Sequence, residues 1–246
     1  LAADEDDRSR PIDCSWSVLG VSDEKVISSC GVELQPWESM HEPERFDYIA
    51  VVGGLMHGGQ KIPRGTTEFL NGAVKVGIPI IGLCTGSFVL ARLGFLDGYT
   101  TCVSWFHRDE FARDFPHLKV ISNRLFIVDR DRLTCAGGTS VVHLAARLVA
   151  RHMGVAVAEK SLRIMIEDHP LPGSTPQPEQ VITHAAHDPI VKRAMLLIEQ
   201  NLGLSNNLSA LQELTKISTR QLQRRFVSDL RRTEQPYAIQ TPPLEQ

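Results

Sequence analysis

The run Gly82-Leu-Cys-Thr-Gly86 is the part of this sequence with the clearest chemical potential. The apolar stretch Ile78–Leu83 leads into it, and apolar residues at helical spacing follow it as far as Leu93. A strand, a tight turn and a helix, with glycines on both sides of a cysteine, form the thiol version of a nucleophile elbow. The turn strains the backbone at its apex, and a helix N-terminus directly after it would lower the pKa of the Cys84 thiol. We therefore expect Cys84 at the carboxyl end of a sheet, beside a pocket.

Several roles remain open for Cys84. We favour an effector pocket that Cys84 lines without reacting, because no convincing base adjoins it in the sequence. The others are a catalytic nucleophile, a redox-sensing thiol and a small residue that only fits the turn. His107 lies 23 residues further on and is either a ligand contact or a structural residue beside Trp105. The candidate pocket residues are Gly53, Gly54, Cys84, Thr85, Gly86, Trp105 and His107.

A second chemical pattern lies near the end of the sequence, where arginine and glutamine side chains recur in Arg220–Phe226. Two capping boxes, Ser209 with Gln212 and Ser218 with Gln221, predict two short helices, the first over 208–214, separated by a turn, which is a helix-turn-helix. In the second helix Leu222 and Phe226 must face the core, so Arg220 and Arg224 face outward. Arginine and glutamine side chains suit guanine and adenine edges. Lys216, Arg225 and Arg231 are better placed for phosphates, which would give affinity without sequence preference. The candidate DNA-binding residues are Lys216, Arg220, Gln221, Gln223, Arg224 and Arg225.

The charge distribution agrees with this interpretation. Between Asp188 and Arg232 there are eight basic and four acidic residues, a net charge of +4, whereas the whole chain has a net charge of −3. The remainder therefore has a net charge of −7, and an asymmetry of this kind is a hint of a nucleic-acid-binding module. A solvated surface helix is the alternative, and the two capping boxes favour DNA binding over it.

The predicted secondary structure falls into two groups of elements. Strands are expected at 16–19, 48–52, 78–83, 125–128 and 133–135, and helices at 66–76, 86–93, 140–151 and 155–166. This alternation predicts a doubly wound α/β fold with a mainly parallel sheet. Four prolines between Pro170 and Pro178 predict an extended linker. We expect an α/β domain over 1–168, a linker over 169–187 and a small all-α domain over 188–246.

Composition restricts the class of protein. The 246 residues are 42% hydrophobic and 22% charged, as in ordinary globular proteins. No apolar run is long enough to span a membrane. The five cysteines are odd in number, widely spaced and without a C-x-x-C pair, so we expect reduced thiols in a cytoplasm, with neither a disulfide scaffold nor a metal site. No cofactor motif is present.

Residues 48–138 resemble the class I glutamine amidotransferase-like superfamily in its PfpI branch, which implies a flavodoxin-like sheet. The resemblance rests on Val52-Gly-Gly54, Gly82-Leu-Cys-Thr-Gly86, Leu96-Asp-Gly98 followed by Ser104, Trp105 and His107, and Leu133-Thr-Cys-Ala-Gly137. Proteases of this branch have histidine where this chain has Thr85. Isocyanide hydratases share the Cys-Thr-Gly form but use an acidic residue near the chain start. GlxA-type regulators, which carry an AraC-type DNA-binding domain, also share it. The first strand of this fold and its helix are expected to be missing from this sequence.

Residues 194–230 resemble the first helix-turn-helix of the AraC family. That family has a second such unit beyond a long connecting helix, and Arg231–Gln246 has neither pattern, so the expected DNA-binding domain is partial. The two resemblances imply a cytoplasmic, homodimeric transcription regulator of the GlxA-like AraC family rather than an enzyme. Its effector would be a small metabolite, with amino acids and quaternary amines the first classes to consider, and its macromolecular partner promoter DNA. The alternative is a thiol-dependent hydrolase or isocyanide-hydratase-like enzyme acting through Cys84.

Overall fold

The computed structural model describes residues 14–28, 30–54, 61–178, 188, 190–191, 194–195, 212, 215 and 217–230. The chain divides into two compact units, residues 1–177 and 178–246. Within the described ranges, no helix has both the length and the hydropathy needed to cross a bilayer.

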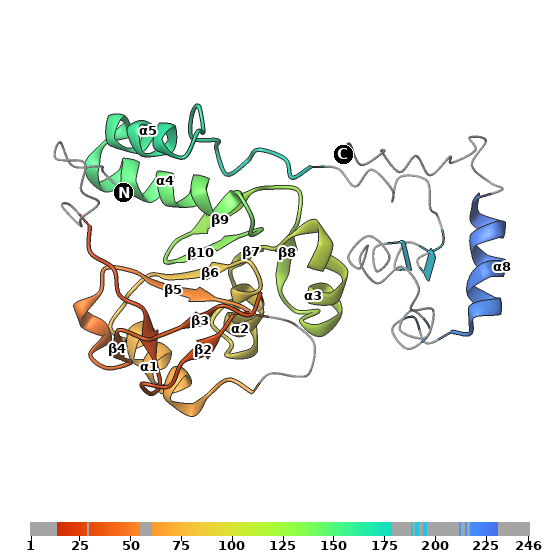
Figure 1. The fold of residues 1–246 in the computed structure, drawn as a ribbon, viewed down its shortest axis with the longest axis horizontal. Helices are drawn as coiled ribbons and strands as arrows, with labels where there is room; N and C mark the ends of the chain where they lie inside the picture. Colours follow the sequence, from red (N-terminus) through yellow and green to blue (C-terminus); the bar gives the residue numbers. More distant parts are fainter. Residues whose placement is uncertain are drawn as a thin grey trace. The chain divides into compact units, whose positions relative to one another are not determined.

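A four-stranded sheet forms the centre of the first unit (Figure 1). Its strands are, in spatial order, β5 (Ile49–Val52), β6 (Ile80–Leu83), β10 (Arg132–Cys135) and β9 (Phe126–Asp129). The first three are parallel and β9 is antiparallel to β10. The mainly parallel α/β sheet predicted for this part of the chain is therefore confirmed.

Helices cover both faces of this sheet (Figure 1). α1 (Arg64–Lys75) and α2 (Gly86–Arg92) pack on one face, and α4 (Ser140–Met153) packs on the other, with α5 (Val155–Ile164) against α4. A hydrophobic core lies on each face of the sheet, and successive residues of β6 pack in different cores. Ile80 packs with α1 and α2, while Ile81 packs with α4. Burial on both faces explains why β6 is a continuous apolar run in the sequence, whereas in β5 Ile49 is buried and Val52 is exposed.

Shorter elements surround the sheet. β1 (Leu19–Gly20) pairs with β4 (Glu38–Ser39), β2 (Val26–Ile27) with β3 (Glu33–Leu34), and β7 (Thr100–Cys102) with β8 (Lys119–Ile121). Single-turn helices η1 (Pro43–Arg45) and η2 (Trp105–His107) and the helix α3 (Arg108–Asp114) complete this set. The strand expected at 16–19 is reduced to β1, which lies outside the four-stranded sheet. β7, β8 and α3 were not predicted.

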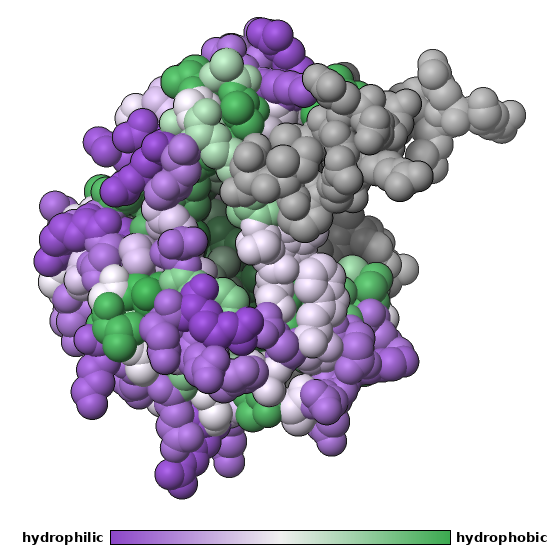
Figure 2. Space-filling view, turned by 90° about the vertical axis from the view of Figure 1, so that its left-hand side faces the viewer, coloured by the Kyte–Doolittle hydropathy of each residue, from purple (hydrophilic) through white to green (hydrophobic). Residues whose placement is uncertain are grey.

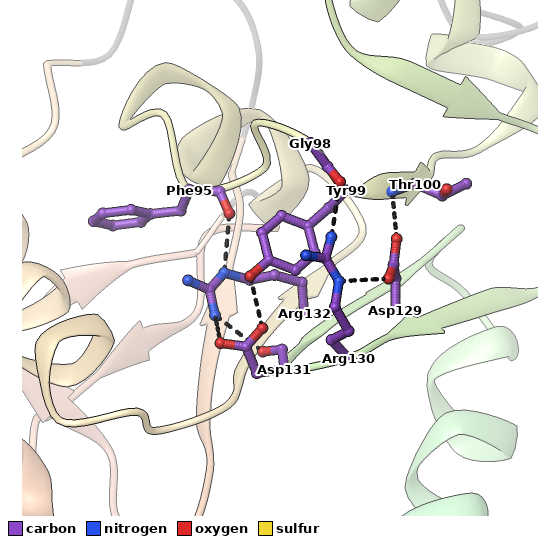
Figure 3. Close-up of polar contacts among 8 residues, drawn as sticks. All are labelled: Phe95, Gly98, Tyr99, Thr100, Asp129, Arg130, Asp131 and Arg132. Atoms are coloured by element: carbon purple, nitrogen blue, oxygen red, sulfur yellow. Dashed lines mark hydrogen bonds and ion pairs between the residues drawn. The ribbon is translucent and has the colours of Figure 1, made fainter.

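Side-chain contacts of Tyr99 connect the start of β10 to the segment after α2 (Figure 3). Its hydroxyl donates a hydrogen bond to Asp131 Oδ1 over 2.8 Å, and the Arg130 guanidinium lies 3.8 Å from its ring centroid. The buried Arg132 side chain donates from Nε to the Phe95 carbonyl over 2.9 Å and also pairs with Asp131. Because Arg132 is the first residue of β10, this cluster anchors the end of the strand opposite to Cys84.

The proline-rich stretch lies against the first unit as far as residue 177. The Leu125 amide donates to the carbonyls of Gly173 and Thr175 over 3.1 and 3.0 Å. Leu171 packs on the core beneath α4, and the Gln177 side chain is buried. Residues 171–177, part of the expected linker, thus form a packed segment of the α/β unit.

Candidate functional site

Cys84 occupies the apex of the turn between β6 and α2. Its φ is +54°, in the left-handed region that residues other than glycine rarely adopt, with an energetic cost on the order of 1–3 kcal/mol. The strained apex expected from the elbow motif is therefore present. A Cβ atom at Gly86 would lie 2.0 Å from the Val51 carbonyl oxygen, so only glycine lets α2 begin this close to β5.

The glycines after β5 also belong to this turn. A Cβ at Gly53 would lie 2.1 Å from Thr85 Oγ1, and the Thr85 hydroxyl donates to the Gly54 carbonyl over 2.9 Å. The structure thus brings together Gly53, Gly54, Cys84, Thr85 and Gly86, five of the seven residues predicted for the pocket.

Gly137, which was not among the predicted site residues, lies directly against the Cys84 side chain. A Cβ at this position would lie 2.5 Å from Cys84 Sγ, and the residue has a φ of +93°. Both observations require glycine here. The Ala-Gly-Gly run after β10 could have indicated this site residue from the sequence. β10 is the parallel neighbour of β6, so its carboxyl end must lie beside Cys84.

The electrostatics of Cys84 differ from the sequence expectation. Burial of part of the side chain raises the pKa of the Cys84 thiol above its ordinary value, and the neighbouring Cys135 raises it further. A hydrogen bond from the Thr85 backbone opposes this change without reversing it. The predicted lowering of this pKa is wrong, because desolvation outweighs the turn's backbone donor. At neutral pH the side chain is a thiol, which suits a pocket wall better than an activated nucleophile or an acidified redox sensor.

Trp105 and His107 lie on η2, and His107 packs against α2. The His107 ring makes an edge-to-face contact with Phe88, with centroids 5.8 Å apart, and its Nδ1 lies 3.4 Å from Glu110 Oε2. Neither of these two His107 contacts involves Cys84 Sγ. Trp105 and His107 therefore remain predicted pocket members, and His107 contacts the helix that follows Cys84.

The second chemical pattern falls on α8 (Thr219–Leu230) of the second unit. Leu222 is buried, while Arg220, Gln221, Gln223, Arg224 and Arg225 are all exposed. The predicted capping box is formed: the Ser218 amide donates to Gln221 Oε1 over 3.0 Å, and the Gln221 amide donates to Ser218 Oγ over 3.3 Å. Lys216 and most of the preceding helix expected at 208–214 lie outside the described residues.

Arg225 differs from its neighbours because it has an acidic partner. Its Nη1 lies 2.6 Å from Asp188 Oδ2, and Asp188 Oδ1 caps the next helical turn by accepting the Ile190 amide over 2.8 Å. Burial opposes ionisation of Asp188, but these hydrogen bonds outweigh it and lower the pKa of the carboxyl. Arg225 thus contributes to the second unit's own structure through its ion pair with Asp188.

Comparisons with known proteins agree on the class of the first unit. Residues 8–151 match the DJ-1/PfpI family. A solved structure of an AraC family transcriptional regulator from Pseudomonas putida superposes with a TM-score of 0.52 and 26% identity, over 61% of this chain and 80% of that one.

Two curated relatives represent two kinds of activity. The HTH-type transcriptional regulator GbdR of Pseudomonas aeruginosa is 30% identical over 216 residues, which cover 86% of this chain and 57% of that protein. An isonitrile hydratase of Pseudomonas putida is 28% identical over 148 residues, 60% of this chain and 63% of that enzyme. The chain spans little more than half the length of the regulator.

Proposed function

The chain belongs to the DJ-1/PfpI family, and from this premise we propose that it is a transcription regulator whose α/β unit senses a small molecule and whose second unit binds promoter DNA. The observation that carries this proposal is the reach of the similarity to GbdR. That similarity covers 86% of the chain, more than the 177 residues of the first unit alone can supply, so it continues into the unit that holds α8.

The second unit supplies the surface for DNA. Arg220 and Arg224 are four residues apart on α8 and exposed, whereas Leu222 between them is buried. This is the division of faces that a recognition helix requires, with side chains able to read base edges directed away from the core. A helix-turn-helix over this region, completed by the helix expected at 208–214, is part of the proposal.

The first unit supplies the effector pocket. Its walls are Cys84, Thr85 and the glycines at 53, 54 and 86, with Trp105 and His107 at its edge. The raised pKa of Cys84 favours binding over catalysis, since the neutral thiol is a weak nucleophile. Amino acids and quaternary amines are the first effector classes that we propose. An isonitrile hydratase activity is the second candidate, favoured by the positive φ of Cys84 and by the relative of that name.

A homodimer is proposed for the assembled regulator, since paired DNA sites match a two-fold symmetric protein. Large apolar side chains are exposed at the start of the chain: Trp16, Val21, Val26, Ile27, Val32, Leu34 and Trp37. Hydrophobic patches also interrupt the mostly hydrophilic face drawn in Figure 2. Light scattering at tens of micromolar is the direct measurement of assembly, and a strictly monomeric protein would contradict this part of the proposal.

DNA binding is tested by selecting bound duplexes from a random-sequence pool with the purified chain, then titrating the selected and scrambled duplexes at two salt concentrations. Arg220→Ala or Arg224→Ala should cost about 1–3 kcal/mol on the selected duplex and leave scrambled binding nearly intact. Arg225→Ala is expected to weaken both duplexes alike and to reduce the salt dependence. Because this substitution also removes the ion pair with Asp188, its circular dichroism spectrum is compared with that of the parent chain. Equal proportional losses for all three variants would contradict the face assignment. Selection of no sequence, together with Cys84-dependent hydration of isonitriles, would favour the enzyme.

A further inference from the structure

Gln177 has a buried side chain that forms hydrogen bonds through both its amide nitrogen and its amide oxygen. It is 7% exposed and is the last residue of the first unit. Its Nε2 donates to the Val103 carbonyl over 2.9 Å and to the Arg124 carbonyl over 2.6 Å, while its Oε1 accepts the Trp105 amide over 2.8 Å. A neutral amide offers two N–H donors and an acceptor, so all three partners are matched at once.

Two of these three partners lie in the loop that carries the predicted pocket residues. Val103 and Trp105 flank the start of η2, and the third residue of η2, His107, packs its ring on Phe88 of α2. α2 begins two residues after Cys84. A continuous series of packed groups therefore runs from the elbow through α2 and η2 to the Gln177 amide.

The chain on the other side of Gln177 leads to the second unit. Residues before it are fixed on the first unit, since the Leu171 amide lies 3.3 Å from His143 Nδ1 and the Gly173 carbonyl accepts the Leu125 amide. Pro178, directly after it, is the first residue of the second unit. Gln177 is thus the point at which the chain leaves the α/β unit, and it is held there by the loop that also carries two predicted pocket residues.

We propose that Gln177 is a positioning residue that couples the pocket loop at Trp105 to the chain segment entering the second unit. Occupation of the pocket beside Cys84 shifts η2, which changes the hydrogen bonds of Gln177 and so the hold on residues 171–178. This proposal rests on the proposed function for its biological meaning, because it supplies the route by which an effector would alter DNA affinity. Coupling of this kind has to be demonstrated between the two places directly.

The test introduces a defined occupant at Cys84 and measures amide hydrogen exchange elsewhere. Iodoacetamide is the probe: the Cys84 thiolate forms a carbon–sulfur bond, iodide leaves, and the thiol proton goes to the buffer. A background with Cys14→Ser and Cys30→Ser leaves Cys84 as the exposed thiol, because Cys102 and Cys135 are buried. Exchange is followed in peptides covering 103–107, 121–127 and 171–178, with mass spectrometry confirming the single modification.

Three substitutions are compared in this background. Gln177→Leu removes all three hydrogen bonds at similar volume. Gln177→Glu keeps the acceptor for the Trp105 amide but sets a carboxylate against two carbonyl oxygens, and it provides the same comparison if the leucine variant fails to fold. Ser174→Ala is the matched control, since Ser174 is exposed in the same segment.

Without the probe, Gln177→Leu should raise exchange of the Trp105 amide by about tenfold, whereas Ser174→Ala should change nothing. With Cys84 alkylated, exchange in 103–107 and in 171–178 should change together in the parent and in Ser174→Ala. In Gln177→Leu and Gln177→Glu the change should stay confined to 103–107. If alkylation leaves 171–178 unaffected in the parent, or still alters it in both Gln177 variants, the coupling role is overturned. Neither result depends on DNA, so failure of the proposed regulator function would be seen separately in the duplex titrations.

Discussion

The turn at Cys84 and the loop at Trp105 are neighbours in the same unit but are built in opposite ways. At the turn, backbone meets backbone: Gly86 approaches Val51 so closely that no Cβ atom would fit. At the loop, the backbone is held by the Gln177 side chain, which comes from 72 residues further along the chain. A close-packed backbone has no room to move, while a loop held by hydrogen bonds to one amide can exchange them. The turn at Cys84 is therefore the fixed part of the site, and the loop at Trp105 is the part that can respond to a ligand.

The largest effect is expected when a methyl group is added to the turn. Gly86→Ala places a Cβ against the Val51 carbonyl oxygen, and because the obstacle is backbone, no side chain can rotate away. We expect a loss of about 3 kcal/mol or more in the free energy of unfolding, measured by urea denaturation. Gly72→Ala is the matched control on α1, where the nearest atom would be Pro43 Cγ at 3.3 Å, and it should change stability by less than about 1 kcal/mol. Similar losses for both would show that the turn is not specially crowded.

The sequence carried enough information for the fixed part of the site and too little for the responsive part. The Gly-x-Cys-x-Gly spacing sets local backbone geometry, so the positive φ of Cys84 and the need for Gly86 could be predicted from adjacent residues. β5 and β6 were predicted within two residues because both are continuously apolar, although burial on both faces is the reason only for β6. Gln177 could not be found in this way, because its partners lie 53 to 74 residues away and its proline-rich surroundings indicated a linker.

The same reasoning explains the other differences. β7 is only three residues long, and its Thr-Thr-Cys sequence has no apolar run, so its burial depends on contacts that the local pattern does not contain. The pKa of Cys84 was predicted in the wrong direction because the turn's donors are local and visible in the sequence, whereas the burial that outweighs them is created by the whole fold.

A moderate effect is expected in the reactivity of Cys84 compared with that of Cys30. Both residues are exposed, but a hydrogen bond from Ser28, together with the Val32 backbone, lowers the pKa of Cys30, whereas burial raises that of Cys84. Only the thiolate reacts, so iodoacetamide should modify Cys30 several-fold faster at neutral pH. The rate at Cys84 should keep rising after the rate at Cys30 has levelled off as pH increases. Ser28→Ala should slow Cys30 and leave Cys84 unchanged, and a Cys84 rate that levels off first would contradict the electrostatic description.

The smallest effect concerns Thr85, whose hydroxyl makes the hydrogen bond that the turn forms with the end of β5. If the turn depends on backbone packing, removing this bond should matter little. Thr85→Val keeps the volume and deletes the donation to the Gly54 carbonyl, which is exposed and can bind water instead. We expect a loss of about 0.5–1 kcal/mol in the free energy of unfolding, with Thr85→Ser as the control that retains the hydroxyl. A loss as large as that of Gly86→Ala would mean that the Thr85 side chain, and not the close backbone approach, holds the turn. The contrast with the Trp105 loop would then disappear, since both regions would depend on hydrogen bonds from one side chain.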